Sequence, residues 1–291
     1  MQWIDRRLPP EYPSLVKIFH LLLLPFITSC VVKTPPSAPP LLPGDPSAPS
    51  QVTPQESLAI AQEISNHPWK PFSNNIKHAE DKAGIRVNTP DIGHEPGLKR
   101  QGWWVPGNVN TGIPYKWGGF DDLTSFDQAI ANGLAGGDVA TPEKRRADNA
   151  AVSAQAAGID CSGFVSRCLK LPTVHDTTQL PAVCTPLAGW ADVRPGDVLN
   201  IPHRHVILCA GWASPDHRWL YYYETGGPPD YWKPGLKQAP LEKLAALGYQ
   251  PLRYTGMARE AGAAGGDSKA ALTRSVKATA VSVTEPSIGE P

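Results

Sequence analysis

The chain has 291 residues, with 27 basic and 27 acidic side chains and a formal net charge of +0. Because it shows no basic stripe or basic pole, nucleic acid is not an expected partner. Hydrophobic residues make up 41% of the sequence, which is enough for a packed core in the middle of the chain.

The first residues have the pattern of an export signal. Arg6, Arg7 and Lys17 supply positive charge, and the apolar run 18–26 is too short to span a bilayer as a helix. The segment closes with Ile27-Thr28-Ser29-Cys30, which resembles the bacterial lipobox. That resemblance implies a signal peptide over residues 1–29 and lipidation of Cys30; an ordinary signal peptide or a buried strand is the alternative.

A lipidated Cys30 would anchor the protein in a membrane. Residue 31 is Val and not Asp, which by resemblance to sorting in Gram-negative bacteria favours the outer membrane, facing the periplasm. Residues 30–52 are rich in Pro, Ser and Ala, so we expect an extended tether. Residues 258–291 are rich in Ala, Gly, Ser and Thr, and we interpret them as a disordered tail.

Between these ends, helix signals come first. Thr53-Pro54-Gln55-Glu56 begins a helix in which Thr53 is the N-cap and Glu56 completes a capping box. Residues 67–102 are polar with few periodic segments, and we expect irregular structure there. Further helices are predicted at 124–132, 141–157 and 241–247, and another starts at Asp160 or Cys161.

Strand signals follow in the second half. Runs rich in β-branched and aromatic residues, separated by turn residues, predict strands at 198–201, 205–212 and 219–224. Helices followed by antiparallel strands favour an α+β fold, with one folded domain over residues 53–257. The nine tryptophans are expected either in the core or as a stacking wall for a peptide or sugar.

The five cysteines separate by context. Cys30 is the candidate anchor and Cys161 the candidate nucleophile. An exported protein meets an oxidising compartment, so a disulfide such as Cys168–Cys184 is one option for the others, while Cys209 has no assigned role. Cys161 and Cys168 cannot pair on one helix, because a separation of about 10 Å at about 1.5 Å per residue exceeds bridging distance.

The chemistry centres on a thiol and an imidazole. Cys161 lies at a predicted helix start capped by Asp160, and a helix N-terminus and a nearby imidazolium both favour the attacking thiolate. His205 begins a predicted strand and is the candidate general base. His203 is its rival, expected on the same strand face, and His205 is preferred because it directly precedes the apolar run. Asp197 is expected to shape the turn before this strand.

Four motifs in this order resemble the NlpC-type family of papain-like bacterial cell-wall peptidases. They are Tyr115-Lys116-Trp117-Gly118-Gly119, Asp160-Cys161-Ser162-Gly163-Phe164-Val165, Arg194-Pro195-Gly196-Asp197 and His205-Val206, all within residues 112–227. The resemblance implies a papain-like fold, in which a helix carrying the nucleophile packs on an antiparallel sheet carrying the base. It also implies a cysteine peptidase that cuts amide bonds in peptidoglycan stem peptides, with Cys161 as nucleophile and His205 as base.

The resemblance also implies roles for other residues. The family usually places His, Asn or Gln on the strand after the base to orient the imidazole, and the matching position here is Glu224. An acidic residue can hold an imidazole tautomer; a surface Glu is the alternative. Tyr115 matches a tyrosine near the nucleophile that binds substrate or the oxyanion, or else packs in the core. Trp117 and Ser162 are further substrate or oxyanion candidates.

One departure from the family is an insertion at residues 120–159, with two predicted helices. It is expected to cover the cleft and restrict access, which affects the choice of substrate more than the chemistry. The resemblance implies that the bond cut is a γ-D-glutamyl to diamino acid linkage or a related amide, such as an amide to the sugar's lactyl group.

Other classes of function compete with this one. His203, His205, Cys209 and Glu224 would be the ligands of a zinc site, although their spacing matches no recognised zinc pattern. A wall-binding lipoprotein with a degenerate site is a non-enzymatic alternative, and a hydrolase for another amide is a third. The leading interpretation needs neither a metal nor a cofactor.

Overall fold

The computed structural model of the chain describes residues 50–94, 102–226 and 232–258. The chain divides into two compact units, Met1–Asp45 and Pro46–Pro291, and every described residue belongs to the second. The predicted signal peptide, Cys30, the tether before residue 50 and the tail after residue 258 therefore lie outside the described residues. None of the helices in the described ranges is long and apolar enough to span a membrane.

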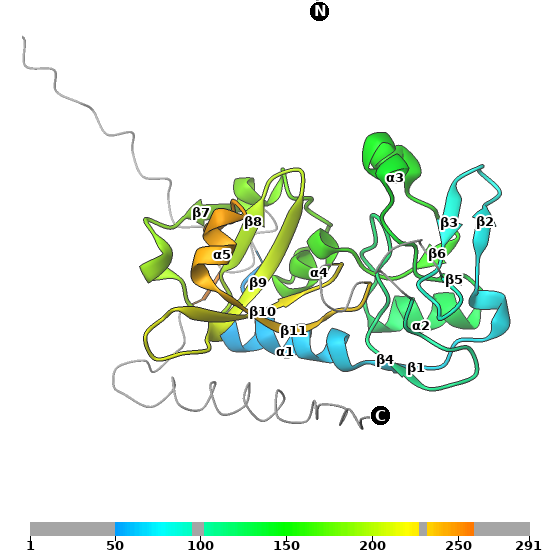
Figure 1. The fold of residues 1–291 in the computed structure, drawn as a ribbon, viewed down its shortest axis with the longest axis horizontal. Coiled ribbons are helices and arrows are strands. Elements are labelled where there is room, and N and C mark those ends of the chain that lie inside the picture. The colour runs from blue at the N-terminus through cyan, green and yellow to red at the C-terminus, as the bar shows by residue number, and fades with distance from the viewer. Residues whose placement is uncertain (1–49, 95–101, 227–231, 259–291) are drawn as a thin grey trace, which may run out of the picture. The chain divides into compact units, whose positions relative to one another are not determined.

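The described residues combine helices with mostly antiparallel strands, which is compatible with the expected α+β class. The α-helices are α1 (Pro54–Asn66), α2 (Leu123–Ala131), α3 (Pro142–Ala147), α4 (Cys161–Cys168) and α5 (Leu241–Ala246). Figure 1 shows α4 beside β9 and β10, with α1 running past the same strands.

The largest sheet has six strands in the order β11-β10-β9-β8-β12-β7, and all neighbours in it are antiparallel. Its strands are β7 (Cys184–Pro186), β8 (Val198–Ile201), β9 (His205–Trp212), β10 (Trp219–Glu224), β11 (Gly235–Pro240) and β12 (Gln250–Tyr254). The predicted strands at 198–201, 205–212 and 219–224 are confirmed, and β9 begins at His205 as expected.

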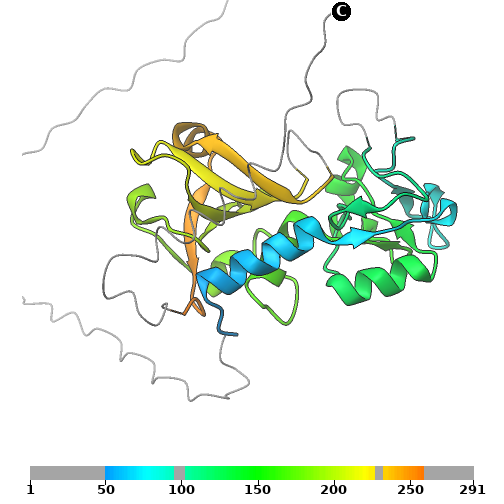
Figure 2. The ribbon, with the colours of Figure 1, turned by 90° about the horizontal axis from the view of Figure 1, so that it is seen from below.

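Short strands form three small sheets. The antiparallel pairs are β1 (Pro68–Trp69) with β4 (Asn110–Thr111) and β2 (His78–Glu80) with β3 (Arg86–Asn88), and the parallel pair is β5 (Ala135–Gly136) with β6 (Ala156–Ala157). Figure 2 shows α1 leading directly into the part of the chain that holds these pairs. The expectation of irregular structure over residues 67–102 was therefore wrong in part, because backbone pairing builds β1, β2 and β3 there.

The start of α1 follows the predicted capping box. The Thr53 hydroxyl accepts the Glu56 backbone N–H at 3.1 Å, and the Glu56 carboxylate accepts the Thr53 N–H at 2.8 Å. Just before this helix, Val52 is fully buried and donates its N–H to the carbonyl of Gly256. The fold thus already includes Val52, which the sequence pattern places in the tether.

The main core lies between α4 and the large sheet. Phe164, Val165 and Cys168 of α4 are fully buried and share one apolar cluster with Val206 and Leu208 of β9. Burying a side chain of this size contributes about 1.5–3 kcal/mol. The apolar spacing of three and four residues along α4 therefore fixes which side of the helix faces the sheet, and with it the position of Cys161.

The helix predicted at 141–157 is shorter than expected, and this is a correction. It ends at Ala147, because Asp148 adopts φ 50°, a left-handed conformation that an α-helix cannot continue. The chain instead turns back, and Ala156–Ala157 pairs in parallel with Ala135–Gly136. The helices predicted at 124–132 and 241–247 differ from α2 and α5 only at their end residues.

Four cysteines lie in the described residues, and all are free thiols: Cys161, Cys168, Cys184 and Cys209. The Cys168–Cys184 disulfide, one of the options from the sequence, is not formed. Burial raises the pKa of the Cys184 thiol from 9.0 to about 12, and raises the pKa values of Cys168 and Cys209 further still. These three thiols are therefore inert core residues at neutral pH.

Candidate active site

Cys161 is the first residue of α4, and Asp160 holds it there. The Asp160 carboxylate accepts the Gly163 N–H at 2.7 Å and the Ser162 hydroxyl at 2.8 Å. Its second oxygen accepts the Gly118 N–H at 3.0 Å. Asp160 thereby caps the helix and ties it to the Trp117-Gly118-Gly119 turn. Burial raises the pKa of Asp160, an effect that these hydrogen bonds oppose.

The turn and the helix approach each other closely. The Asp160 N–H donates to the Gly119 carbonyl at 3.1 Å. An added Cβ on Gly163 would lie 2.0 Å from the same oxygen, so the approach requires glycine in the first turn of α4. Cys161 is half-buried at the start of the helix.

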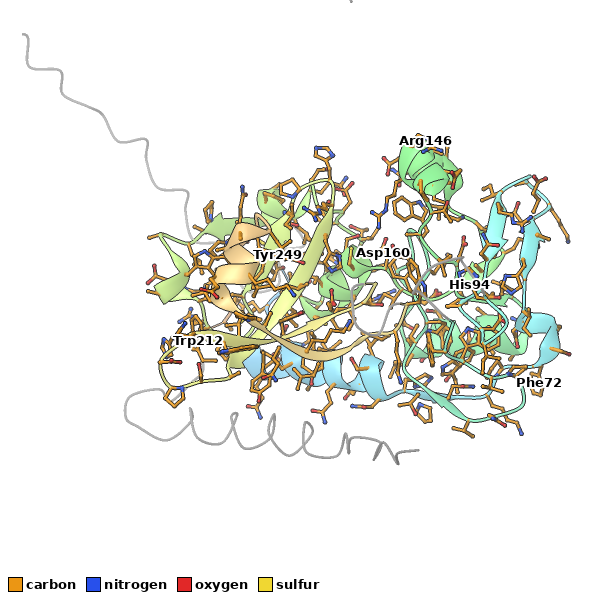
Figure 3. The ribbon with its side chains drawn as sticks, viewed as in Figure 1. Phe72, His94, Arg146, Asp160, Trp212 and Tyr249 are labelled. Atoms are coloured by element: carbon orange, nitrogen blue, oxygen red, sulfur yellow. The ribbon has the colours of Figure 1, made fainter. Side chains whose placement is uncertain are left out.

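His205 connects the helix to the sheet. Its Nε2 lies 2.5 Å from a carboxylate oxygen of Glu224 at the end of β10, and Cys161 lies close enough to raise the pKa of His205. Figure 3 labels Asp160, which precedes Cys161, and Tyr249, whose ring meets the His205 ring edge-on at 6.4 Å between centroids. The structure thus brings together Cys161, His205 and Glu224 from α4, β9 and β10.

The pKa of His205 reflects these partners. Burial lowers it, but the charge and hydrogen bond of Cys161 and those of Glu224 outweigh burial and raise the pKa from 6.5 to about 10. The imidazole is therefore held in its protonated form at neutral pH. A cationic imidazole beside a thiol stabilises the thiolate electrostatically.

Glu224 is almost fully buried, at 3% exposure, which excludes the alternative that it is a surface residue. Burial raises its pKa, but His205 and Lys237 together lower it below 4.5. The Lys237 ammonium donates to the other Glu224 oxygen at 2.8 Å. One carboxylate thus holds an imidazole on one side and an ammonium on the other.

Tyr115 lies close to Cys161 but is 4% exposed. Its ring packs against Trp232 at 5.3 Å, and its backbone N–H donates to the Trp232 carbonyl at 2.9 Å. Burial, followed by the charges of Cys161 and Asp160, raises the pKa of Tyr115 well above 10.0. The phenol is therefore a neutral group close to the thiol, and it packs in the core at the same time.

Trp117 and Ser162 have different surroundings. The Trp117 indole N–H donates to the Asp148 carbonyl at 3.1 Å, and the Arg145 guanidinium lies 5.6 Å from the ring centroid. Trp117 is half-buried, with a cation from the insertion against its ring. Ser162 is 6% exposed, and its hydroxyl donates to the Asp160 carboxylate. The Ser162 side chain therefore takes part in the helix cap.

A backbone hydrogen bond ties the insertion at 120–159 to this turn, at a residue that also forms a buried ion pair within the insertion. Lys144 of α3 donates to Asp138 at 2.7 Å, and the Asp138 carbonyl accepts the Trp117 N–H at 2.8 Å. Burial raises the pKa of Asp138 to about 6, which Lys144 opposes. The insertion is thus joined to the turn that contacts α4, and its Arg145 lies against Trp117 of that turn.

His203 is not on the strand, which corrects the expectation that it shares a face with His205. It lies in the turn before β9 with φ 61° and is exposed. Within the described ranges, no group of three or more His, Cys, Asp and Glu side chains is placed to hold a metal ion. The suggested zinc set therefore does not assemble.

Sequence patterns missed Lys237, Tyr249 and Arg145. Lys237 lies on β11, whose sequence Gly-Leu-Lys-Gln-Ala-Pro has no β-branched residue to signal a strand. Tyr249 follows α5 after Gly248, a segment with no signal that relates it to His205. Arg145 belongs to a short helix whose contact with Trp117 is a tertiary feature.

Comparison with protein-family models, with curated proteins and with solved structures found no match to this chain.

Proposed function

We propose that this protein is a cysteine hydrolase of the NlpC type with a papain-like fold, acting on amide bonds in peptidoglycan stem peptides. The observation that carries the proposal is the set Cys161, His205 and Glu224, in which a thiol at a helix N-terminus lies near an imidazole that a buried carboxylate contacts. A nucleophile, its base and a group that orients the base are the parts that thiol catalysis requires.

In the proposed first half-reaction, the Cys161 sulfur attacks the carbonyl carbon of the amide. Because Glu224 occupies Nε2 of His205, the remaining nitrogen, Nδ1, exchanges the proton with the thiol. The S–C bond forms, the C–N bond breaks, and His205 gives its proton to the leaving amine. The backbone N–H of Cys161, at the start of α4, is positioned to stabilise the oxyanion.

In the second half-reaction, water hydrolyses the thioester. His205 takes a proton from the water, the new C–O bond forms, and the S–C bond breaks to release the carboxylic acid and the thiolate. Glu224 stays ionised throughout and holds the imidazole in one orientation, the role that Asp plays in other triads.

The substrate and the location rest on the sequence pattern. The four motifs resemble a family of cell-wall peptidases, and the lipobox-like segment ending at Cys30 supports a lipid anchor at the outer membrane, facing the periplasm. The Arg145 cation, which the insertion places against the Trp117 ring, supports a substrate that carries a negative charge, and stem peptides carry free carboxylates.

The proposal is tested by incubating the purified protein with peptidoglycan and identifying the released peptides by mass spectrometry. Cys161→Ala and His205→Ala are compared with Cys184→Ala, a matched control that removes a buried thiol outside the site. Peptides released by the wild type and by Cys184→Ala, but not by the other two variants, support a cysteine hydrolase, and the peptide masses identify the bond.

Two results would overturn the proposal. Binding to the wall without release of any peptide, across several wall chemistries, would favour a non-catalytic lipoprotein or a hydrolase for another amide. Release that a metal chelator abolishes and that Cys161→Ala retains would favour a metal-dependent enzyme.

A further inference from the structure

Lys237 takes part in a chain of polar contacts that crosses four neighbouring elements. The chain runs from Cys161 on α4 through His205 on β9 and Glu224 on β10 to Lys237 on β11. Glu224 and Lys237 are both buried, at 3% and 8% exposure. A buried ion pair of this kind depends on both partners, because removing either one leaves a charge in a poorly hydrated environment.

Strand register places the ammonium beside the carboxylate. On β11, Lys237 pairs with Tyr222 and Gly235 pairs with Glu224. Lys237 is therefore the diagonal neighbour of Glu224, within reach of a long side chain. The residue directly opposite Glu224 is a glycine, so no side chain from that position competes for the carboxylate.

We propose that Lys237 is a positioning residue that orients the Glu224 carboxylate and neutralises it, so that the pair acts on His205 as a neutral acceptor would. This inference rests on the proposed function. A buried carboxylate with no counter-charge raises the pKa of the imidazolium, which slows transfer of its proton to a leaving amine. A carboxylate with an ammonium on its other oxygen still accepts a hydrogen bond, but it attracts the positively charged ring more weakly.

Several titratable groups surround this pair and enter its pH dependence. They are Tyr222 on the same strand as Glu224, His205 on β9, Lys237 on β11, Tyr249 after α5 and, through His205, Cys161 on α4. Burial and then Glu224 raise the pKa values of Tyr222, to about 12, and of Tyr249. Both phenols are therefore neutral near pH 7, so the charges around the pair include those of Cys161, His205, Glu224 and Lys237, and that of Arg204 beside Tyr249.

The test compares the wild type with Lys237→Met, Glu224→Gln and the double variant Glu224→Gln/Lys237→Met on a stem peptide. Lys237→Met should lower kcat about 10²-fold through misplacement of the base, with a smaller effect on KM. It should also move both limbs of the pH–rate profile to higher pH, because the remaining three groups bind protons more tightly without the ammonium. Lys237→Arg keeps the charge and should retain most of the activity.

The double variant separates positioning from a merely structural role. A neutral glutamine needs no ammonium, so the double variant should be more active than either single variant. Lys243→Met, an exposed lysine on nearby α5, is the matched control and should behave as the wild type. Melting temperatures of all variants identify any that fail to fold; for these, the Arg variant carries the comparison.

Two results would overturn the role of Lys237 while leaving the hydrolase intact. One is a double variant whose loss of activity is the sum of the losses in the single variants. The other is a pH–rate profile of Lys237→Met whose two limbs are unchanged. If the wild type cleaves no peptide, the proposed function fails. The effect of Lys237 on Glu224 and His205 is then tested separately by following the titration of the His205 imidazole by NMR. An upward shift of that titration in Lys237→Met supports the electrostatic role, and an unchanged titration contradicts it.

Discussion

Gly163 meets the carbonyl oxygen of Gly119 so closely that an added Cβ would lie 2.0 Å from it. At this contact the first turn of α4, which begins at Cys161, packs against the turn that follows Trp117. The position of Cys161 is therefore set by a backbone-to-backbone approach that glycine alone allows, and not only by the packing of α4 on the sheet.

Gly163→Ala should destabilise the protein by about 1–3 kcal/mol, because the new methyl group forces two backbone segments apart. Urea unfolding measures the loss. Gly189→Ala is the matched control, since its φ is −175° and an added Cβ there would meet nothing within 4 Å. Equal stability of the two variants would contradict the close approach.

Asp160→Ala should cost about 0.5–2 kcal/mol of stability through loss of the helix cap, and it should also abolish peptide release. The second effect arises because Asp160 joins α4 to Gly118 as well as capping it. Asp122→Ala removes a similar cap from α2, where Asp122 accepts the Ser125 N–H at 2.7 Å, and should leave activity intact. If both variants lose activity equally, the link to Gly118 has no special role.

The raised pKa of His205 predicts how stability changes with pH. The folded pKa of about 10 lies above the usual 6.5, so the protonated ring stabilises the fold. That contribution is complete below pH 6.5 and is lost as the pH rises toward 10. Unfolding free energies of the wild type should therefore fall over this window more steeply than those of His205→Asn. Parallel curves would show that His205 is not held protonated.

Arg145→Ala should raise KM for stem peptides about three- to tenfold with little change in kcat, the size expected for one exposed charge contact. The reason is that Arg145 lies over the Trp117 ring and its charge reaches Tyr115 beside the nucleophile. Arg146→Ala is the control, because Arg146 pairs with Glu143 at 3.1 Å on the exposed surface. A KM effect of the same size in both variants would mean that the insertion contributes only general charge.

Local signals in the sequence predicted the parts of the site that local structure determines. Thr53 and Glu56 mark the start of α1, Asp160 marks the start of α4, and His205 begins β9 where the apolar run starts. Each of these depends on residues a few positions away along the chain, which a reader of the sequence can see.

Features that depend on partners far along the chain were missed. Strand β11 has little strand propensity, and pairing with β10 makes it a strand, so Lys237 gave no sign of its proximity to Glu224. The end of α3 at Asp148 was missed because neither Gly nor Pro stands there. In addition, the Asp148 carbonyl accepts a hydrogen bond from the indole of Trp117, which is distant in the sequence.

In the proposed mechanism, Cys161 carries the acyl group between the two half-reactions. The most direct measurement is mass spectrometry of the intact protein, quenched in acid shortly after mixing with a stem peptide, followed by location of any adduct. We expect an added acyl mass on Cys161 that forms and decays with turnover and is absent in Cys161→Ala. Turnover by the wild type with no adduct on Cys161, or peptide release by Cys161→Ala, would contradict it.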